Sequence, residues 1–166
     1  MLQYPYSVLL AEPEWGPGEA TWAVAERLMT HGFGVIPAQG TSDLAGAMAD
    51  GPDIGAALLG WNLFASEREF HAVADELASS PARPPVVLLS ETVSERSVPE
   101  SAARRADGFF WLPADSPSYV ALQVEHLVRA HAEELMSQFL TELTGDPSRC
   151  LALPLPARGD LVPGGN

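Results

Sequence analysis

Short apolar runs alternate with amphipathic segments along most of the chain. Five runs are almost continuously apolar, which is typical of strands buried in a parallel sheet. They predict strands at 7–11, 33–37, 54–60, 86–89 and 108–112. Between them, apolar residues recur at helical spacing and predict helices at 20–29, 41–49, 66–78 and, interrupted by Pro99, 95–105.

The last helical segment is the longest. Ser116 is a residue type that caps helices, and Pro117 stands in the first turn, where proline is favoured. Apolar residues then recur every three to four positions until Gly145, which predicts a helix of roughly 28 residues, about 42 Å long. The following stretch, 146–166, contains four prolines and no helical period, so we expect a linker or frayed end.

Five strands alternating with helices predict an α/β fold of the flavodoxin or receiver type. This fold is an open parallel five-stranded sheet with helices on both faces and strand order 2-1-3-4-5. A site in such a sheet lies at the carboxyl ends of the first and third strands. We expect a receiver-like domain at 1–115, a long linker helix at 116–145 and a tail at 146–166.

Composition excludes several kinds of chemistry. Acids outnumber bases by 22 to 9, the formal net charge is −13, and every base is an arginine. Without lysine the chain cannot form a pyridoxal phosphate Schiff base, use a P-loop lysine or employ a lysine general base. The acidic balance also argues against nucleic acid and anionic membrane as partners.

Targeting and redox signals are sparse. The single cysteine, Cys150, excludes an internal disulfide, and the first six residues have no basic segment typical of a signal peptide. The longest apolar run, 86–89, is far too short to span a bilayer. We therefore expect a cytoplasmic protein.

Receiver phosphorylation requires an acidic pair after the first strand, an Asp after the third, a hydroxyl after the fourth and a Lys after the fifth. Glu12 and Glu14 are acids at the first position, and Ser90 supplies a hydroxyl. The third strand, however, runs into Gly60-Trp61-Asn62 without an Asp, and the fifth into Leu112-Pro113 without a Lys. We predict no phosphorylation, with Glu12 and Glu14 as solvated loop acids.

Other chemistry is equally weakly supported. The Trp15–Gly18 turn lacks the spacing of a phosphate-binding loop and is flanked by acids, so we interpret it as a turn leading into a helix. His126 and His131 are five residues apart and face different sides of a helix, which disfavours a metal site. Ser90 lies in no nucleophile elbow. We predict no catalytic, cofactor-binding or metal-binding residue.

The long last helix carries the clearest functional signal. A domain of about 115 residues is roughly 30 Å across, shorter than the predicted helix. The second half of that helix still presents apolar residues, and exposed apolar stripes mark contact surfaces. The predicted partner-contact residues are Leu135, Met136, Phe139, Leu140 and Leu143. The alternative is a helix that breaks or folds back near 130–132.

Three stretches of this sequence resemble a known family. The stretch 109–120, Phe-Phe-Trp-Leu-Pro-Ala-Asp-Ser-Pro-Ser-Tyr-Val, resembles the end of the N-terminal domain of the Orn/Lys/Arg decarboxylases. The continuation to Leu143 is similar to that family's linker helix, with Met136-Ser137-Gln138 in place of its usual proline pair, and 85–90 fits its fourth strand. The resemblance covers about 7–145.

The resemblance implies a receiver-like "wing" domain without phosphorylation chemistry. In that family a catalytic domain carrying pyridoxal phosphate follows, and none of its cofactor motif is present here. It implies a non-catalytic assembly or regulatory domain, a homo-oligomer, and as partner its own missing catalytic domain or a homologous decarboxylase subunit. Two alternatives stay open: a stand-alone pseudo-receiver that binds a protein partner, and a small-ligand module at the carboxyl ends of strands one and three.

Overall fold

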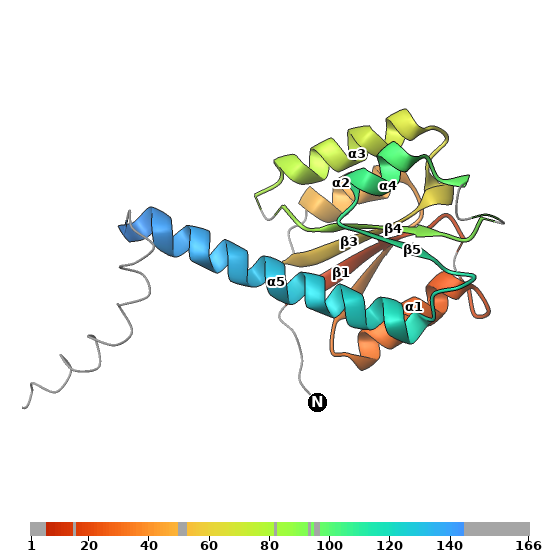
Figure 1. Cartoon of the computed structure of the whole chain (residues 1–166), viewed down its shortest axis with the longest axis horizontal. Coiled ribbons are helices and arrows are strands. Elements are labelled where there is room, and N and C mark those ends of the chain that lie inside the picture. The colour runs from red at the N-terminus through yellow and green to blue at the C-terminus, as the bar shows by residue number, and fades with distance from the viewer. Residues whose placement is uncertain are drawn as a thin grey trace, which may run out of the picture. The chain divides into compact units, whose positions relative to one another are not determined.

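The computed structural model describes residues 6–14, 16–49, 53–81, 83–92, 94 and 97–144. Strands and helices alternate along it (Figure 1). The strands are β1 (Ser7–Ala11), β2 (Gly34–Ala38), β3 (Ile54–Gly60), β4 (Val86–Ser90) and β5 (Gly108–Trp111). The helices are α1 (Ala20–Thr30), α2 (Thr41–Ala49), the 3-10 turn η1 (Trp61–Leu63), α3 (Glu67–Ser79), α4 (Glu100–Arg105) and α5 (Pro117–Thr144).

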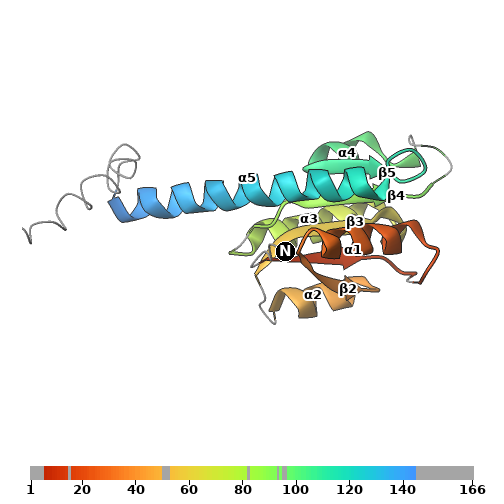
Figure 2. The ribbon, with the colours of Figure 1, turned by 90° about the horizontal axis from the view of Figure 1, so that it is seen from below.

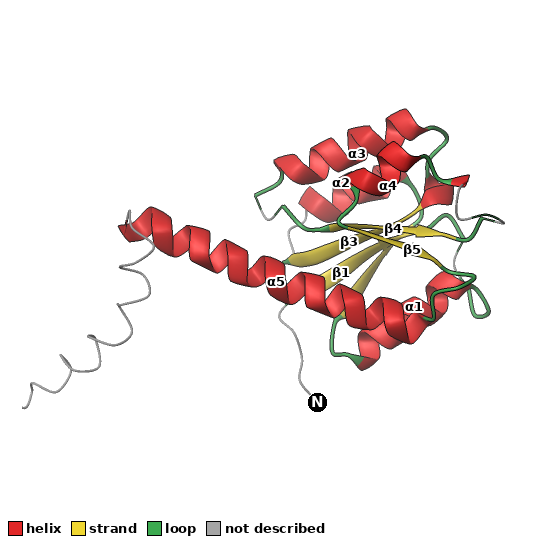
Figure 3. Cartoon of the chain, viewed as in Figure 1, coloured by secondary structure: helices red, strands yellow, loops and turns green. Residues whose placement is uncertain are grey.

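The five strands form one parallel sheet in the order β2-β1-β3-β4-β5, as predicted (Figure 3). β3 lies at its centre, and all seven of its residues are buried. A strand covered on both faces has no solvent side, which is why its sequence, IGAALLG, shows no polar alternation. The edge strand β2 contains Pro37, a residue that only an edge strand accommodates readily.

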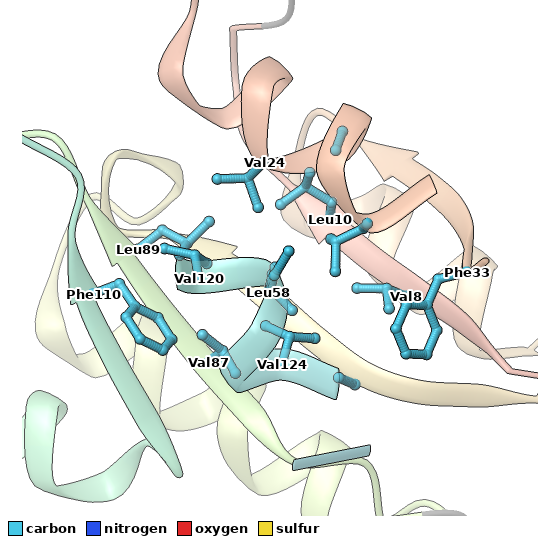
Figure 4. Close-up of a cluster of buried hydrophobic side chains, with 14 of the residues drawn as sticks. Val8, Leu10, Val24, Phe33, Leu58, Val87, Leu89, Phe110, Val120 and Val124 are labelled. Carbon is cyan, nitrogen blue, oxygen red and sulfur yellow. The ribbon is translucent and has the colours of Figure 1, made fainter. Parts of the chain in front are cut away.

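Side chains that alternate along each strand build two separate cores. One face packs against α1 and the first part of α5, and the other against α2, α3 and α4 (Figures 1 and 2). In β1, Val8 and Leu10 belong to the first core, whereas Leu9 and Ala11 belong to the second. Figure 4 shows the first core, where Val120 and Val124 of α5 meet strand residues such as Leu58 and Val87.

α5 begins as its sequence predicts. The backbone N–H of Tyr119 donates to Ser116 Oγ at 3.2 Å, and Pro117 is the first helical residue. The chain divides into two units, one ending at Val128 and one beginning at Arg129, and this boundary falls within α5. No helix of the described residues combines the length and apolar character that crossing a bilayer requires.

Some element boundaries differ from the predicted ones. α4 begins at Glu100, directly after the Pro99 that was expected to interrupt the helix at 95–105, and Pro99 stands at the cap position with φ −58° and ψ 141°. β2 lies one residue further along the chain than predicted. The predicted tail at 146–166 lies outside the described residues.

Candidate functional site

The parallel strands end at one edge of the sheet, where a receiver domain has its chemistry. Glu12 follows β1, Gly60 ends β3, Ser90 ends β4 and Trp111 ends β5. Neighbouring pairs in the register include Gly60 with Leu89, and Ser90 with Trp111. The sequence prediction therefore placed these positions at the correct edge of the sheet.

Glu12 is buried, contrary to the prediction that it is a solvated loop acid. Only 4% of its surface is exposed, whereas Glu14, two residues later, is exposed as predicted. The backbone N–H of Glu12 donates to the carbonyl of Ala38 at 2.9 Å, which extends the pairing of β1 with β2 by one residue. This extension turns the Glu12 side chain toward the end of β3.

Gly60 makes room for the Glu12 carboxyl. A Cβ atom on residue 60 would lie 2.0 Å from Oε2 of Glu12 and 3.2 Å from the carbonyl oxygen of Ala11. No side chain fits there without displacing Glu12. The Glu12 carboxyl therefore occupies the space at the end of the third strand. Residue 60 is a glycine, and a phosphoacceptor Asp would have no room at this position.

Three further carboxylates act on Glu12, and we call Glu12, Glu14, Glu19 and Glu91 the acidic cluster. Burial, followed by the charges of Glu91, Glu14 and Glu19, raises the pKa of Glu12 from 4.5 to about 7. The pKa of Glu91 is also raised, chiefly by burial and the charge of Glu19, although the backbone N–H of Ala20 partly opposes the shift. The edge thus favours protons rather than anions such as phosphate.

The hydroxyl of Ser90 is tied into a local turn. Its Oγ lies 2.9 Å from Oγ1 of Thr92, which donates in turn to the carbonyl of Ser94 at 2.7 Å. The indole N–H of Trp111 donates to the carbonyl of Thr92 at 2.9 Å and holds this turn against β5. Ser90 is 1% exposed. These contacts describe a hydroxyl and an indole that stabilise the turn after β4.

Two histidines, His31 and His71, contact glutamates. Nδ1 of His31 lies 2.8 Å from Oε2 of Glu125, joining the end of α1 to α5, and Nε2 of His71 lies 3.2 Å from Oε1 of Glu67. The sequence does not reveal the His31–Glu125 pair, because the two residues are 94 positions apart. No group of His, Cys, Asp or Glu among the described residues has the arrangement of a metal site.

An apolar groove lies between α1 and the edge strand β2. Its volume is about 470 Å³, and Trp22, Ala25, Met29, Val35, Pro37, Gln39 and Asp43 line it. Its polar rim is already engaged, since Oδ2 of Asp43 accepts the backbone N–H of Gln39 at 3.0 Å. The sequence gives no signal for this groove, because the residues that line it have the patterns of ordinary helices and strands.

The predicted partner-contact residues all lie on α5. Met136, Phe139 and Leu143 are 59%, 56% and 66% exposed, and Leu135 and Leu140 are half-buried. Their spacing of three and four residues places them along one side of the helix. Their flanks are acidic, with Glu133, Glu134 and Glu142 close by in the sequence. The helix continues through 130–132, so it does not break there, contrary to the alternative considered above.

Solved structures of two kinds share this fold. Lysine decarboxylase A from Pseudomonas aeruginosa matches with TM-score 0.63 and 17% identity, covering 86% of this chain and 21% of that one. NtrX from Brucella abortus, in complex with ADP, matches with TM-score 0.67 and 20% identity, covering 86% and 30%. The chain thus spans less than a third of the length of either protein.

Other solved structures with this fold are matched over almost their whole length. An atypical orphan response regulator, described as having a phosphorylation-independent regulatory mechanism, matches with TM-score 0.55 and 17% identity, covering 74% of this chain and 95% of that one. Comparison with curated protein sequences gives no match.

The family comparison agrees with the resemblance of the sequence. The model of the Orn/Lys/Arg decarboxylase N-terminal domain matches residues 17–131, which include α1, the sheet from β2 onward and the first half of α5. This match covers more than half of the chain. The chain therefore belongs to the Orn/Lys/Arg decarboxylase N-terminal domain family.

Proposed function

We propose that this chain is the non-catalytic assembly or regulatory domain of a pyridoxal phosphate-dependent decarboxylase of basic amino acids. The observation that carries the proposal is the family match over residues 17–131. Its own residues do not fit the cofactor: the chain contains no lysine for an imine, and acids surround the one glycine-containing turn before α1. We therefore assign both catalysis and substrate binding to a separate domain.

The contact with the catalytic domain, or with a homologous subunit, is assigned to the C-terminal half of α5. Three exposed apolar side chains at helical spacing form a stripe that water solvates poorly. The half-buried Leu135 and Leu140 widen the stripe on both sides. A stripe of this width suits a groove between several elements better than the narrow seam of a two-stranded coiled coil.

The first test is the mass of the native protein that carries this domain, measured by immunoblot of the cells that produce it. A band several times larger than 17.7 kDa supports attachment to a decarboxylase. A band near 17.7 kDa that co-purifies with a decarboxylase subunit supports the same role in trans. A band of that size without any decarboxylase contradicts the proposal.

A second test addresses the contact surface. Phe139→Glu places a charge in the stripe and is expected to abolish co-purification with the decarboxylase. Ser137→Glu, an exposed neighbour outside the stripe, is the matched control and is expected to preserve it. Equal behaviour of the two variants would move the contact elsewhere on the domain.

The alternative is a stand-alone pseudo-receiver that binds a protein partner without phosphorylation. The similarity to the orphan response regulator over 95% of that chain supports it. The Glu12 carboxyl beside Gly60, which leaves no room for a phosphoacceptor, fits a pseudo-receiver equally well. Size-exclusion chromatography with light scattering distinguishes these two functions. A pseudo-receiver is expected to elute in a complex with its own partner when it is isolated from cells that lack the decarboxylase.

A further inference from the structure

The buried acid at the carboxyl edge of the sheet is the most unusual group in the molecule. Glu12 is 4% exposed and fills the space that the missing side chain of Gly60 leaves free. No ion pair joins Glu12 to an arginine or histidine among the residues that the structure describes. A buried carboxylate without a compensating cation is costly, so burial favours the neutral acid.

The surroundings of Glu12 act in the same direction from several elements. Glu14 follows it after β1, Glu19 caps the start of α1, and Glu91 follows β4. The end of β3 contributes Gly60, which carries no charge, and the end of β2 contributes the carbonyl of Ala38 to the Glu12 backbone. The charges that raise the pKa of Glu12 are those of Glu91, Glu14 and Glu19, all of them negative.

We propose that Glu12 is a proton-operated lock on the carboxyl edge of the sheet. As a neutral acid it stays packed against Gly60 and holds the ends of β1 and β3 together. As a carboxylate it leaves this position for water and loosens that contact. The lock responds near neutral pH, and it makes the domain tighter on the acid side, opposite to the usual acid denaturation of proteins.

The direction of this pH dependence follows from which state of the chain, folded or unfolded, binds the Glu12 proton more tightly. Because the pKa of Glu12 is raised in the folded state to about 7 from its usual 4.5, the folded state holds this proton more tightly than the unfolded chain. The contribution is present in full below about pH 4.5 and is lost as the pH rises through 7. From pH 5 to 8 the folding equilibrium constant is expected to fall on the order of tenfold to hundredfold through this group alone.

Urea unfolding of the full chain between pH 5 and 8 tests the lock. The many other acids also contribute to the pH dependence, so the informative quantity is the difference between variants. Glu12→Gln keeps the shape of the neutral acid and is expected to remove that tenfold to hundredfold loss. Glu133→Gln removes the same charge from an exposed position on α5, outside the acidic cluster, and is expected to keep it. Equal pH profiles for Glu12→Gln and the wild type would overturn the proposal.

If Glu12→Gln folds poorly, a direct titration of Glu12 in the wild-type chain still tests the proposal. Carboxyl ¹³C chemical shifts of the wild-type chain, assigned through the backbone, report the midpoint of Glu12 itself. A midpoint close to 7 supports the lock, and a midpoint near 4.5 contradicts it. Glu91→Gln removes one neighbouring charge and is expected to move the Glu12 midpoint to lower pH.

Discussion

The two parts of α5 have a similar spacing of apolar residues and different surroundings. Up to Val128 the helix buries Val120, Ala121, Val124 and Val128, whereas from Arg129 to Thr144, all of which the structure describes, no residue is buried. Both parts carry apolar residues every three to four positions. The comparison teaches that such a period specifies a helix with an apolar side, and that it does not specify what covers that side.

The largest expected difference comes from placing a charge in each part. Val124→Asp buries an unpaired carboxylate between α5 and the sheet and is expected to cost about 3–5 kcal/mol, enough to unfold a marginal domain. Phe139→Asp places the same charge at an exposed position and is expected to change the free energy of unfolding by less than about 0.5 kcal/mol. Urea unfolding monitored by circular dichroism measures both.

The exposed part of α5 is expected to matter more for assembly than for stability. Phe139→Asp is expected to weaken association with the partner, and a well-folded variant that still assembles would show that the exposed part of α5 is not a contact surface. A Phe139→Asp variant that unfolds would show that this part of the helix is packed in the isolated chain.

Truncation to alanine gives a smaller version of the same contrast. Val128→Ala removes two buried methyl groups and is expected to cost about 1–3 kcal/mol, since the cavity is only partly refilled. Leu143→Ala removes a larger side chain that is 66% exposed and is expected to cost less than about 0.5 kcal/mol. Similar losses in thermal unfolding would mean that both parts are equally packed.

Polar partners are expected to show the smallest difference. Glu125→Ala breaks the partly buried contact with His31 and is expected to cost about 0.5–1.5 kcal/mol. Glu134→Ala breaks an exposed bond within the helix, from Nε2 of Gln138 at 3.3 Å, and is expected to cost only a few tenths of a kcal/mol. Chemical unfolding at pH 6, with His31→Ala as the second single variant and the double variant completing the cycle, isolates the Glu125–His31 coupling.

Much of the fold could be predicted from local patterns. The α/β alternation, the capped start of α5 and its 28-residue length follow from the spacing of apolar residues and from Ser116 and Pro117. The strand order was inferred from the order that is usual for this fold class. The helix at 95–105 was predicted with an interruption at Pro99, and α4 begins directly after this proline although the helical period extends across it. Proline position therefore outweighed periodicity in this short element.

The site was harder to predict. The receiver-like fold was predicted correctly, whereas Glu12 was expected in solvent and is buried. Its neighbours in the sequence, Pro13 and Glu14, are exposed and suggest a polar loop. Only Gly60, 48 positions later, reveals that a space exists for the buried carboxyl.

The sequence by itself determined the α/β alternation, the absence of any lysine chemistry and the apolar stripe of α5, because these depend on residue type and local spacing. The tertiary structure alone decided that Glu12 is buried among other carboxylates, that His31 meets Glu125, and which part of α5 is covered. These features depend on residues far apart in the chain whose distances are set by the pairing of the strands and the packing of the helices. Local spacing carries no information about such distances.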